Sequence, residues 1–290
     1  MEICSSLYSR GAGYVPAALP TAYGHGVSHP VRAAALLASL AVIAFGASGC
    51  AALESDTPSY ASEESKSRLA GFVRDLGDEL NAYWGDAWGK GWKPAKIRVP
   101  KRAADTECGT IDADETGPAY CGDDRKMVLP ARFFKDQVID ADNNGRNDAA
   151  VAAVVGHEFG HHLQTLSGIE EVVTQAEEEN PEIANLISVA YELNADCFMG
   201  IWMSSVDDQK RLEPGDLDEV INVLNNIGDD KLSADAGVKA DPSEFDHGTS
   251  AQRLYWFSEG FNTPDNDAGS KVFDDLFDGT LERDVRSSGA

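Results

Sequence analysis

The feature that most constrains this chain is a histidine-rich run inside a segment with helical spacing. Small and apolar residues recur so that the sequence predicts one helix over about 149–166. The run HEFGHH, residues 157–162, lies within it. His157 and His161 are four residues apart, so both imidazole rings project from one face of the helix and can reach one cation. The segment therefore predicts a helix that carries two ligands of a single metal site.

Glu158 is the candidate general base of this site. It lies about 100° further round the helix than His157, beside the metal position without needing to bind it. A carboxylate placed there can take a proton from water that the metal activates. The alternative is a solvated helix with incidental histidines, which would require the run to be exposed. An apolar stripe on the opposite side argues against that alternative; it consists of Val151, Val155, Phe159 and Leu166.

The scarcity of histidine narrows the choice of a third ligand. Beyond residue 50 and outside the run, only His247 remains, so carboxylates are the better candidates. Glu192 and Asp196 lie four apart on one face of a second predicted helix, over about 181–204. Like charges at that spacing repel, and their apolar flanks make desolvation costlier, so a nearby cation resolves the conflict. We predict that Glu192 binds zinc and that Asp196 accepts a proton from the far nitrogen of a ligating histidine; a solvated acidic edge is the alternative.

The rest of the chain predicts a mainly helical α+β domain over residues 67–290. Apolar spacing indicates the further helices, and short β-rich runs that end at proline indicate the strands. The predicted elements are helices through 69–83, 217–227 and 250–257, the last capped by Thr249 or Ser250, and strands at 96–99 and 126–129.

The N-terminal region predicts export. An apolar stretch over 33–45 is too short to span a bilayer comfortably and is typical of a signal peptide. Cys50 follows small residues as in a bacterial lipobox, so we expect residues 1–50 to be a leader with lipidation at Cys50. Ordinary cleavage nearby, which leaves an unmodified Cys50, is the alternative. Residues 51–66 predict a flexible acidic tether, and the expected location is the outer face of the cytoplasmic membrane, the periplasm or the medium.

Two cysteines of the exported part are expected to form a disulfide. Cys108 and Cys121 can close a short loop through the turn at Gly117-Pro118. Such a loop would stabilise the fold by roughly 3 kcal/mol in the chain-entropy model.

The charge of the chain argues against a role with nucleic acid. The formal net charge is −25, whereas phosphate backbones require clustered Lys and Arg. An acidic, soluble exterior is the expectation.

A weaker signal precedes the histidine helix. Asp140, Asp142 and Asn144 match the opening of a calcium loop, but its twelfth position is Val151, where a bidentate carboxylate is needed. A polar turn with a helix cap is the alternative to a Ca²⁺ site.

Three ordered motifs resemble one known family. HEFGHHLQ, ELNADCFMG and HGTSAQRLYWFSEGF, in this order, are similar to the signatures of the bacterial neutral zinc metallopeptidases. The resemblance covers about residues 84–261. It implies a gluzincin-like fold with an HExxH helix, a glutamate ligand helix and a small sheet. Asn194 departs from the pattern, because glutamine is frequent there, and the acidic segment 168–179 looks divergent.

The resemblance also suggests roles for His247 and Arg253. Their six-residue separation is similar to an element of membrane-associated gluzincins in which a histidine and an arginine stand near the developing oxyanion. A structural salt bridge is the alternative for Arg253.

The sequence thus predicts an exported zinc metallopeptidase that hydrolyses peptide bonds. Two alternatives remain open at this point: an exported zinc-containing scaffold or binding lipoprotein without catalysis, and a zinc amidase that acts on cell-wall bonds.

Overall fold

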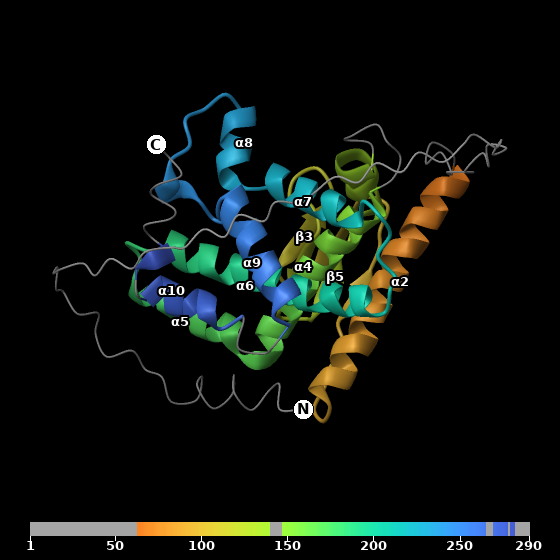
Figure 1. Ribbon diagram of the computed structural model, residues 1–290, viewed down its shortest axis with the longest axis horizontal. Coiled ribbons are helices and arrows are strands. Elements are labelled where there is room, and N and C mark those ends of the chain that lie inside the picture. Colours follow the sequence, from red (N-terminus) through yellow and green to blue (C-terminus); the bar gives the residue numbers. More distant parts are fainter. Residues whose placement is uncertain (1–62, 140–146, 265–268, 278, 282–290) are drawn as a thin grey trace, which may run out of the picture. The chain divides into compact units, whose positions relative to one another are not determined.

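A computed structural model describes residues 63–139, 147–264, 269–277 and 279–281 (Figure 1). This part of the chain is mainly helical with a small sheet, as expected for the α+β class. The helices are α2 (Glu63–Trp88), α3 (Ala131–Phe133), the π-helix η1 (Phe134–Ile139), α4 (Asp148–Ser167), α5 (Ile169–Glu179), α6 (Ala184–Asp208), α7 (Asp216–Asn226), α8 (Asp229–Asp235), the 3-10 helix η2 (Pro242–Glu244), α9 (Ser250–Asn262) and α10 (Lys271–Phe277). The strands are β1 (Lys96–Arg98), β2 (Ala103–Thr106), β3 (Gly109–Asp112), β4 (Ala119–Cys121) and β5 (Lys126–Val128).

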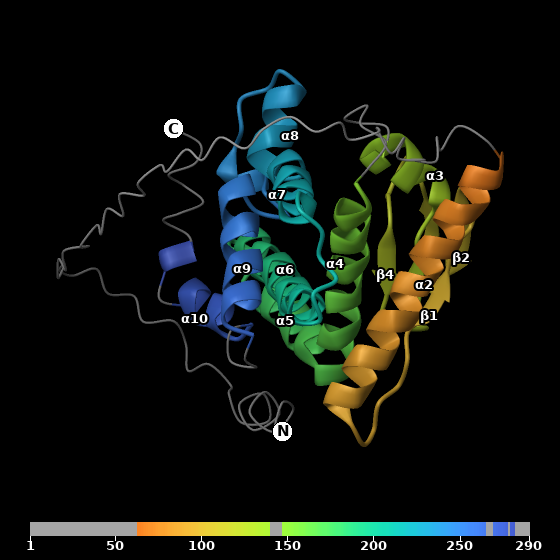
Figure 2. The same ribbon diagram turned by 45° about the vertical axis from the view of Figure 1, so that its right-hand side comes forward.

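Helix α4 is central to the packing. Figure 2 shows it between α6 on one side and the strands with α2 on the other. Its buried residues, among them Val151, Val155 and Phe159, belong to the main hydrophobic core together with residues of α2 and α6. The HEFGHH run therefore lies on a buried helix. This rules out the alternative of a solvated helix in which the histidines have no role.

Glycines let the central helices approach closely. A Cβ at Gly160 would lie 2.7 Å from the Cα of Ala195, so α4 and α6 can meet at this distance only with glycine. A Cβ at Gly260 of α9 would lie 2.1 Å from the carbonyl oxygen of Cys197. Because side chains would hold these backbones apart, the glycines set the distances at which α4, α6 and α9 pack.

The strands form two small sheets. In the first, β5 pairs in parallel with β1 and antiparallel with β4; in the second, β2 and β3 form an antiparallel hairpin. The predicted strands at 96–99 and 126–129 are confirmed as β1 and β5, whereas β2, β3 and β4 were not predicted. The predicted disulfide joins Cys108 to Cys121 across 13 residues, which ties the hairpin to β4.

Two helices begin at other residues than predicted. Helix α2 begins at Glu63, inside the segment predicted as a tether. Helix α6 begins at Ala184 and not at Pro181, because a turn in which the N–H of Ile183 donates to the carbonyl of Asn180 at 3.1 Å precedes it. The divergent acidic segment is helix α5. Thr249 caps α9 with a capping box, as predicted.

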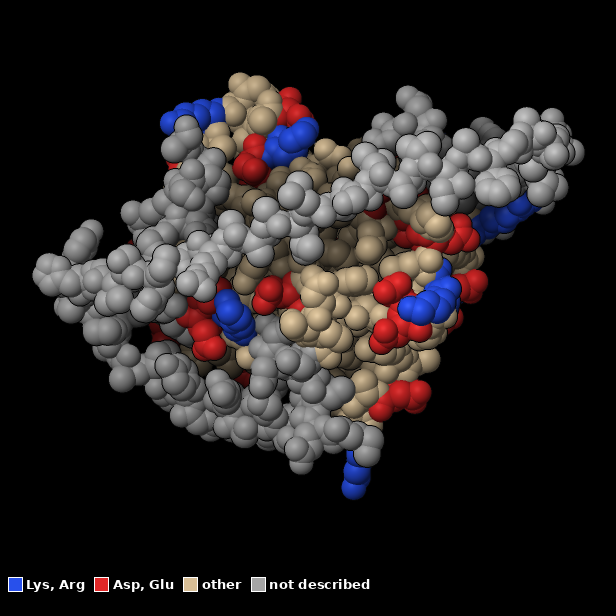
Figure 3. Space-filling view, in the orientation of Figure 1, with Lys and Arg blue, Asp and Glu red and all other residues tan. Residues whose placement is uncertain are grey.

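Three predictions fall outside the described residues. They are the leader with Cys50, the part of the tether before residue 63, and the calcium loop with Asp140, Asp142 and Asn144. Within the described part, none of the helices combines the length and the apolar character that crossing a bilayer requires. On the face in Figure 3, Asp and Glu side chains are spread over the surface, in keeping with the net charge of −25.

Candidate metal centre

His157, His161 and Glu192 meet between α4 and α6. One nitrogen of each histidine and one oxygen of the glutamate all lie within 4.8 Å of one another. Nε2 of His157 is 3.0 Å from Oε2 of Glu192, and Nε2 of His161 is 3.4 Å from Oε1 of the same carboxylate. The structure thus brings together the three residues that were predicted as metal ligands, with both Nε2 atoms turned to the carboxylate.

Asp196 fixes the orientation of His157 from behind. Its Oδ1 lies 2.8 Å from Nδ1 of His157, and it is fully buried. Arg253 of α9 holds the same carboxylate: its Nε donates to Oδ2 at 2.9 Å and its Nη2 donates to Oδ1 at 3.0 Å. Although burial favours the neutral acid, Arg253 and His157 keep the pKa of Asp196 below its usual value. An ionised Asp196 accepts the Nδ1 proton, which leaves Nε2 of His157 free to bind a metal ion.

Gln164 plays the corresponding part for His161, and the sequence did not predict it. Its Oε1 lies 2.8 Å from Nδ1 of His161. Its Nε2 donates to the carbonyl of Tyr191 at 2.6 Å and to Oδ1 of Asn194 at 2.9 Å. Because two acceptors fix the amide nitrogen, the amide oxygen must face His161 and accept its Nδ1 proton. The visible signal was a glutamine three residues after His161 on the same helix.

Asn194, which departs from the family pattern, belongs to the same network. While its Oδ1 accepts from Gln164, its Nδ2 donates to the carbonyl of Gly269 at 2.7 Å. The side chain is 1% exposed. Asn194, although its side chain is shorter than that of glutamine, therefore still accepts the hydrogen bond that orients Gln164.

The donor set fits a zinc ion. Two imidazoles and one carboxylate are ligands that Zn²⁺ prefers, and both imidazoles present Nε2 because their Nδ1 atoms donate elsewhere. A lone pair of Nε2 in His157 that faces the carboxylate oxygen of Glu192 at 3.0 Å would be repelled unless a proton or a metal ion lay between the two atoms. The pKa of His157 is consistent with this need: burial opposes the charged ring, yet Asp196 and Glu192 raise the pKa to about 10. The site is therefore built to hold positive charge.

Glu158 lies beside the three ligand residues and is outside their group. It is 8% exposed. Burial raises its pKa to about 7; the charge of His157 opposes this rise and that of Glu192 adds to it. A carboxyl group with such a pKa exchanges protons near neutral pH, as a general base must.

His247 lies in the loop that precedes α9, and its side chain is 51% exposed. Its charge acts on both Glu158 and Glu192. A residue that the sequence did not predict, Asp229 at the start of α8, holds this loop. Oδ2 of Asp229 accepts the backbone N–H groups of residues 246, 247 and 248 at 2.8–2.9 Å, and Oδ1 lies 3.5 Å from Nδ1 of His247. This carboxylate raises the pKa of His247.

Arg253 differs from the expected place near a reacting oxygen. It is 3% exposed and both of its described bonds to a carboxylate go to Asp196. Its Nη2 comes within 3.3 Å of Nδ1 of His157, on the side of the ring away from the ligand group. This placement favours the alternative, a buried salt bridge that supports His157.

Comparison with known proteins agrees with this geometry. A family model described as "Putative neutral zinc metallopeptidase" matches residues 39–271. The chain belongs to this family. The resemblance of the three motifs is thereby confirmed, and membership of a zinc peptidase family implies Zn²⁺ as the metal.

Relatives of this family member occur in Escherichia coli and Mycobacterium tuberculosis. The chain is 37% identical over 186 residues to the uncharacterized protein YpfJ of Escherichia coli (strain K12). The aligned residues make up 63% of this chain and 64% of that protein. It is 29% identical over 199 residues to the uncharacterized protein Rv2575 of Mycobacterium tuberculosis (strain ATCC 25618 / H37Rv). Here the aligned residues make up 65% of this chain and 66% of that protein. No solved structure matches the chain.

Proposed function

We propose that this family member is a zinc-dependent peptidase that hydrolyses peptide bonds at the centre formed by His157, His161 and Glu192. The observation that carries the proposal is the convergence of these three side chains within 4.8 Å, next to a buried glutamate that is not among them. A structural metal site does not need a buried carboxylate that binds no metal, such as that of Glu158. Hydrolysis requires a general base at that position.

The number of ligands also supports catalysis over a purely structural role for zinc. Structural zinc sites are closed by four protein ligands, whereas catalytic sites keep one position for water or substrate. Within the described residues, the group holds three His, Cys, Asp or Glu side chains and no fourth. The scaffold alternative would need a fourth protein ligand.

Zinc held by the two imidazoles and the carboxylate would supply Lewis-acid chemistry, polarising a carbonyl and lowering the pKa of water. Glu158 takes the proton of the attacking water and later gives it to the leaving nitrogen, for which its raised pKa of about 7 is suited. Asp196 and Gln164 keep the protons of the two histidines on Nδ1. Arg253 keeps Asp196 ionised and in place.

His247 is proposed to donate to the oxygen on which negative charge develops. It is half-exposed, so a substrate can reach it, and Asp229 raises its pKa and so favours the charged ring. A cationic donor at that place stabilises charge that appears only in the transition state.

Export and lipid anchoring at Cys50 are part of the proposal. They rest on the apolar stretch 33–45 and on the small residues before Cys50. The mass of the N-terminal peptide of the protein from membranes tests this point: a diacylglyceryl-modified Cys50 is expected, and an unmodified terminus at any other residue contradicts it.

The test of the proposed function is digestion of a peptide library by the wild-type protein and by Glu158→Gln, with zinc content measured in both. Wild-type protein is expected to cleave peptides, and the variant to keep its zinc while losing at least about 100-fold in rate. Equal rates in the two proteins would contradict the role of Glu158. Cleavage of cell-wall fragments with no cleavage of any peptide would instead show an amidase.

A further inference from the structure

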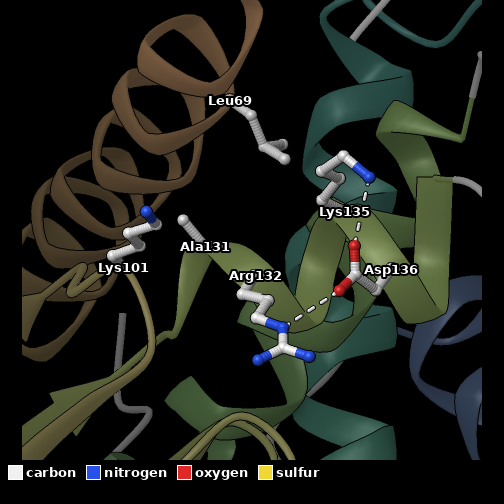
Figure 4. Close-up of a pocket in the computed structure, with 6 residues that line it drawn as sticks. All are labelled: Leu69, Lys101, Ala131, Arg132, Lys135 and Asp136. Carbon is white, nitrogen blue, oxygen red and sulfur yellow. Dashed lines mark hydrogen bonds and ion pairs between the residues drawn. The ribbon is translucent and has the colours of Figure 1, made fainter. Parts of the chain in front are cut away.

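A cavity of about 260 Å³ opens between the start of α2, the loop after β1 and the segment formed by α3 and η1 (Figure 4). It shares no residue with the metal centre. Its walls are formed by Leu69, Lys101, Ala131, Arg132, Lys135 and Asp136.

The charge of this cavity is opposite to that of the chain. Three cations line it against one carboxylate, although the sequence holds 24 Lys and Arg against 49 Asp and Glu. The cations come from three elements: Lys101 from the loop after β1, Arg132 from α3 and Lys135 from η1. Such a concentration of cations in an acidic protein favours an anionic ligand.

The one carboxylate orients two of the cations. Oδ2 of Asp136 accepts from Nε of Arg132 at 3.1 Å, and Oδ1 accepts from Nζ of Lys135 at 3.1 Å (Figure 4). Arg132 also pairs with Asp114, which does not line the cavity, at 3.2 Å. Lys101 takes part in no salt bridge of the described part of the chain. Its ammonium group is therefore the least compensated charge at the cavity.

The backbone of the cavity is held in place before any ligand binds. The N–H of Ala131 donates to the carbonyl of Pro100 at 2.9 Å, and that of Arg132 donates to the carbonyl of Lys101 at 3.1 Å. Phe134 of η1 and Leu69 of α2 are buried in the main core. Because these walls are fixed, a ligand would meet a largely preformed site and would have little chain to order.

We propose that this cavity binds a phosphomonoester group. Such a group carries a charge of about −1.5 to −2 at neutral pH and three acceptor oxygens, which matches a wall with three cations and one carboxylate. A carboxylate has only two acceptor oxygens, so it can contact fewer of the three cationic side chains than a phosphomonoester can. Leu69 and Ala131 provide an apolar surface for the organic part of the ligand. A soluble phosphorylated compound and a lipid of the phosphatidic acid type share this chemistry.

The test is titration of the zinc-loaded full chain with glycerol 3-phosphate, followed by calorimetry at about 0.15 M salt so that long-range repulsion is screened. Saturable binding to one site is expected, and Lys101→Met and Lys135→Met should each weaken it by about tenfold or more. Lys96→Met is the matched control, since Lys96 is exposed on β1 and does not line the cavity. Absence of saturable binding, the same affinity in Lys101→Met, or equally tight binding of acetate would overturn the proposal.

Flotation with vesicles distinguishes the two sources of the group. If vesicles that contain phosphatidic acid carry more wild-type protein than vesicles of phosphatidylcholine alone, and Lys101→Met removes this difference, the ligand is a lipid headgroup. If the two kinds of vesicle carry the same amount of protein although glycerol 3-phosphate binds, the ligand is a soluble phosphomonoester. Circular dichroism and zinc content should be unchanged in Lys101→Met, which keeps a loss of binding distinct from a loss of fold.

Discussion

Oε1 of Gln164 lies 2.8 Å from Nδ1 of His161, and its own amide nitrogen is fixed by the carbonyl of Tyr191 and by Asn194. Replacing Gln164 with Ala removes the acceptor that orients His161, so zinc affinity should fall by about 10- to 100-fold. Zinc affinity is measured by competition with a chelator. Gln175→Ala, on the exposed surface of α5, is the matched control; equal affinities in the two variants would contradict the assigned role.

Arg253 and Asp196 form a buried pair, so the loss of one partner should leave an uncompensated charge. We expect Arg253→Met to lower the free energy of unfolding by about 3–5 kcal/mol. The double variant Arg253→Met with Asp196→Leu should be less destabilised than the sum of the two single variants, because no charge is then left unpaired. Urea unfolding measures all three, and strictly additive losses would show that the two residues do not act as a pair.

Gly160 sets the distance between the two helices that carry the ligands. A Cβ there would lie 2.7 Å from the Cα of Ala195, so Gly160→Ala should separate α4 from α6, destabilise the fold by about 1–3 kcal/mol and weaken zinc binding. Gly71→Ala in helix α2 is the control, because nothing lies within 4 Å of its added Cβ. That variant should be neutral or more stable by up to about 1 kcal/mol. Similar losses of stability at both positions would contradict the close approach.

The pair of His247 and Asp229 predicts a pH dependence of stability. Asp229 raises the pKa of His247, so this group's contribution is fully present below its unfolded pKa of about 6.5 and is lost as the pH rises through the folded pKa. The pKa of Asp229 is lowered: burial opposes this, but His247 and the backbone N–H groups outweigh it. Its contribution is present above about pH 3.9 and is lost as the pH falls through the folded pKa.

The variant His247→Gln isolates the imidazole, because the three backbone bonds to Asp229 remain. It should cost more stability near pH 5.5 than near pH 9, by less than about 1 kcal/mol since the side chain is half-exposed. Urea unfolding of the zinc-saturated protein at the two pH values measures the difference. The opposite order, or the same loss at both values, would contradict the ion pair.

The sequence predicts well what depends on spacing along one helix. Two histidines four residues apart, and the pair of Glu192 and Asp196 at the same spacing, project from single faces whatever the rest of the fold does. The disulfide was predictable because Cys108 and Cys121 are close in the chain. The cap of Thr249 on α9 was predictable because it involves residues that are neighbours in the chain.

What depends on distant contacts was not predicted. Asp229 is 18 residues from His247, and only the path of α8 brings its carboxylate to the loop. Gln164 takes its role from Asn194, 30 residues away. Strands β2 to β4 are three or four residues long and, unlike the equally short β1 and β5, do not run toward a proline that marks where the strand ends. The resemblance to membrane-associated gluzincins placed Arg253 near the reacting oxygen. Helix α9 instead crosses α6 so closely that the guanidinium of Arg253 reaches Asp196.

The metal site is tested most directly by the zinc content of the purified protein and of Glu192→Ala, with Glu178→Ala on the exposed side of α5 as control. We expect one zinc ion per chain in the wild-type protein and in Glu178→Ala. In Glu192→Ala, most of the zinc and the peptide hydrolysis should be lost. Unchanged zinc in Glu192→Ala would contradict the site formed by His157, His161 and Glu192.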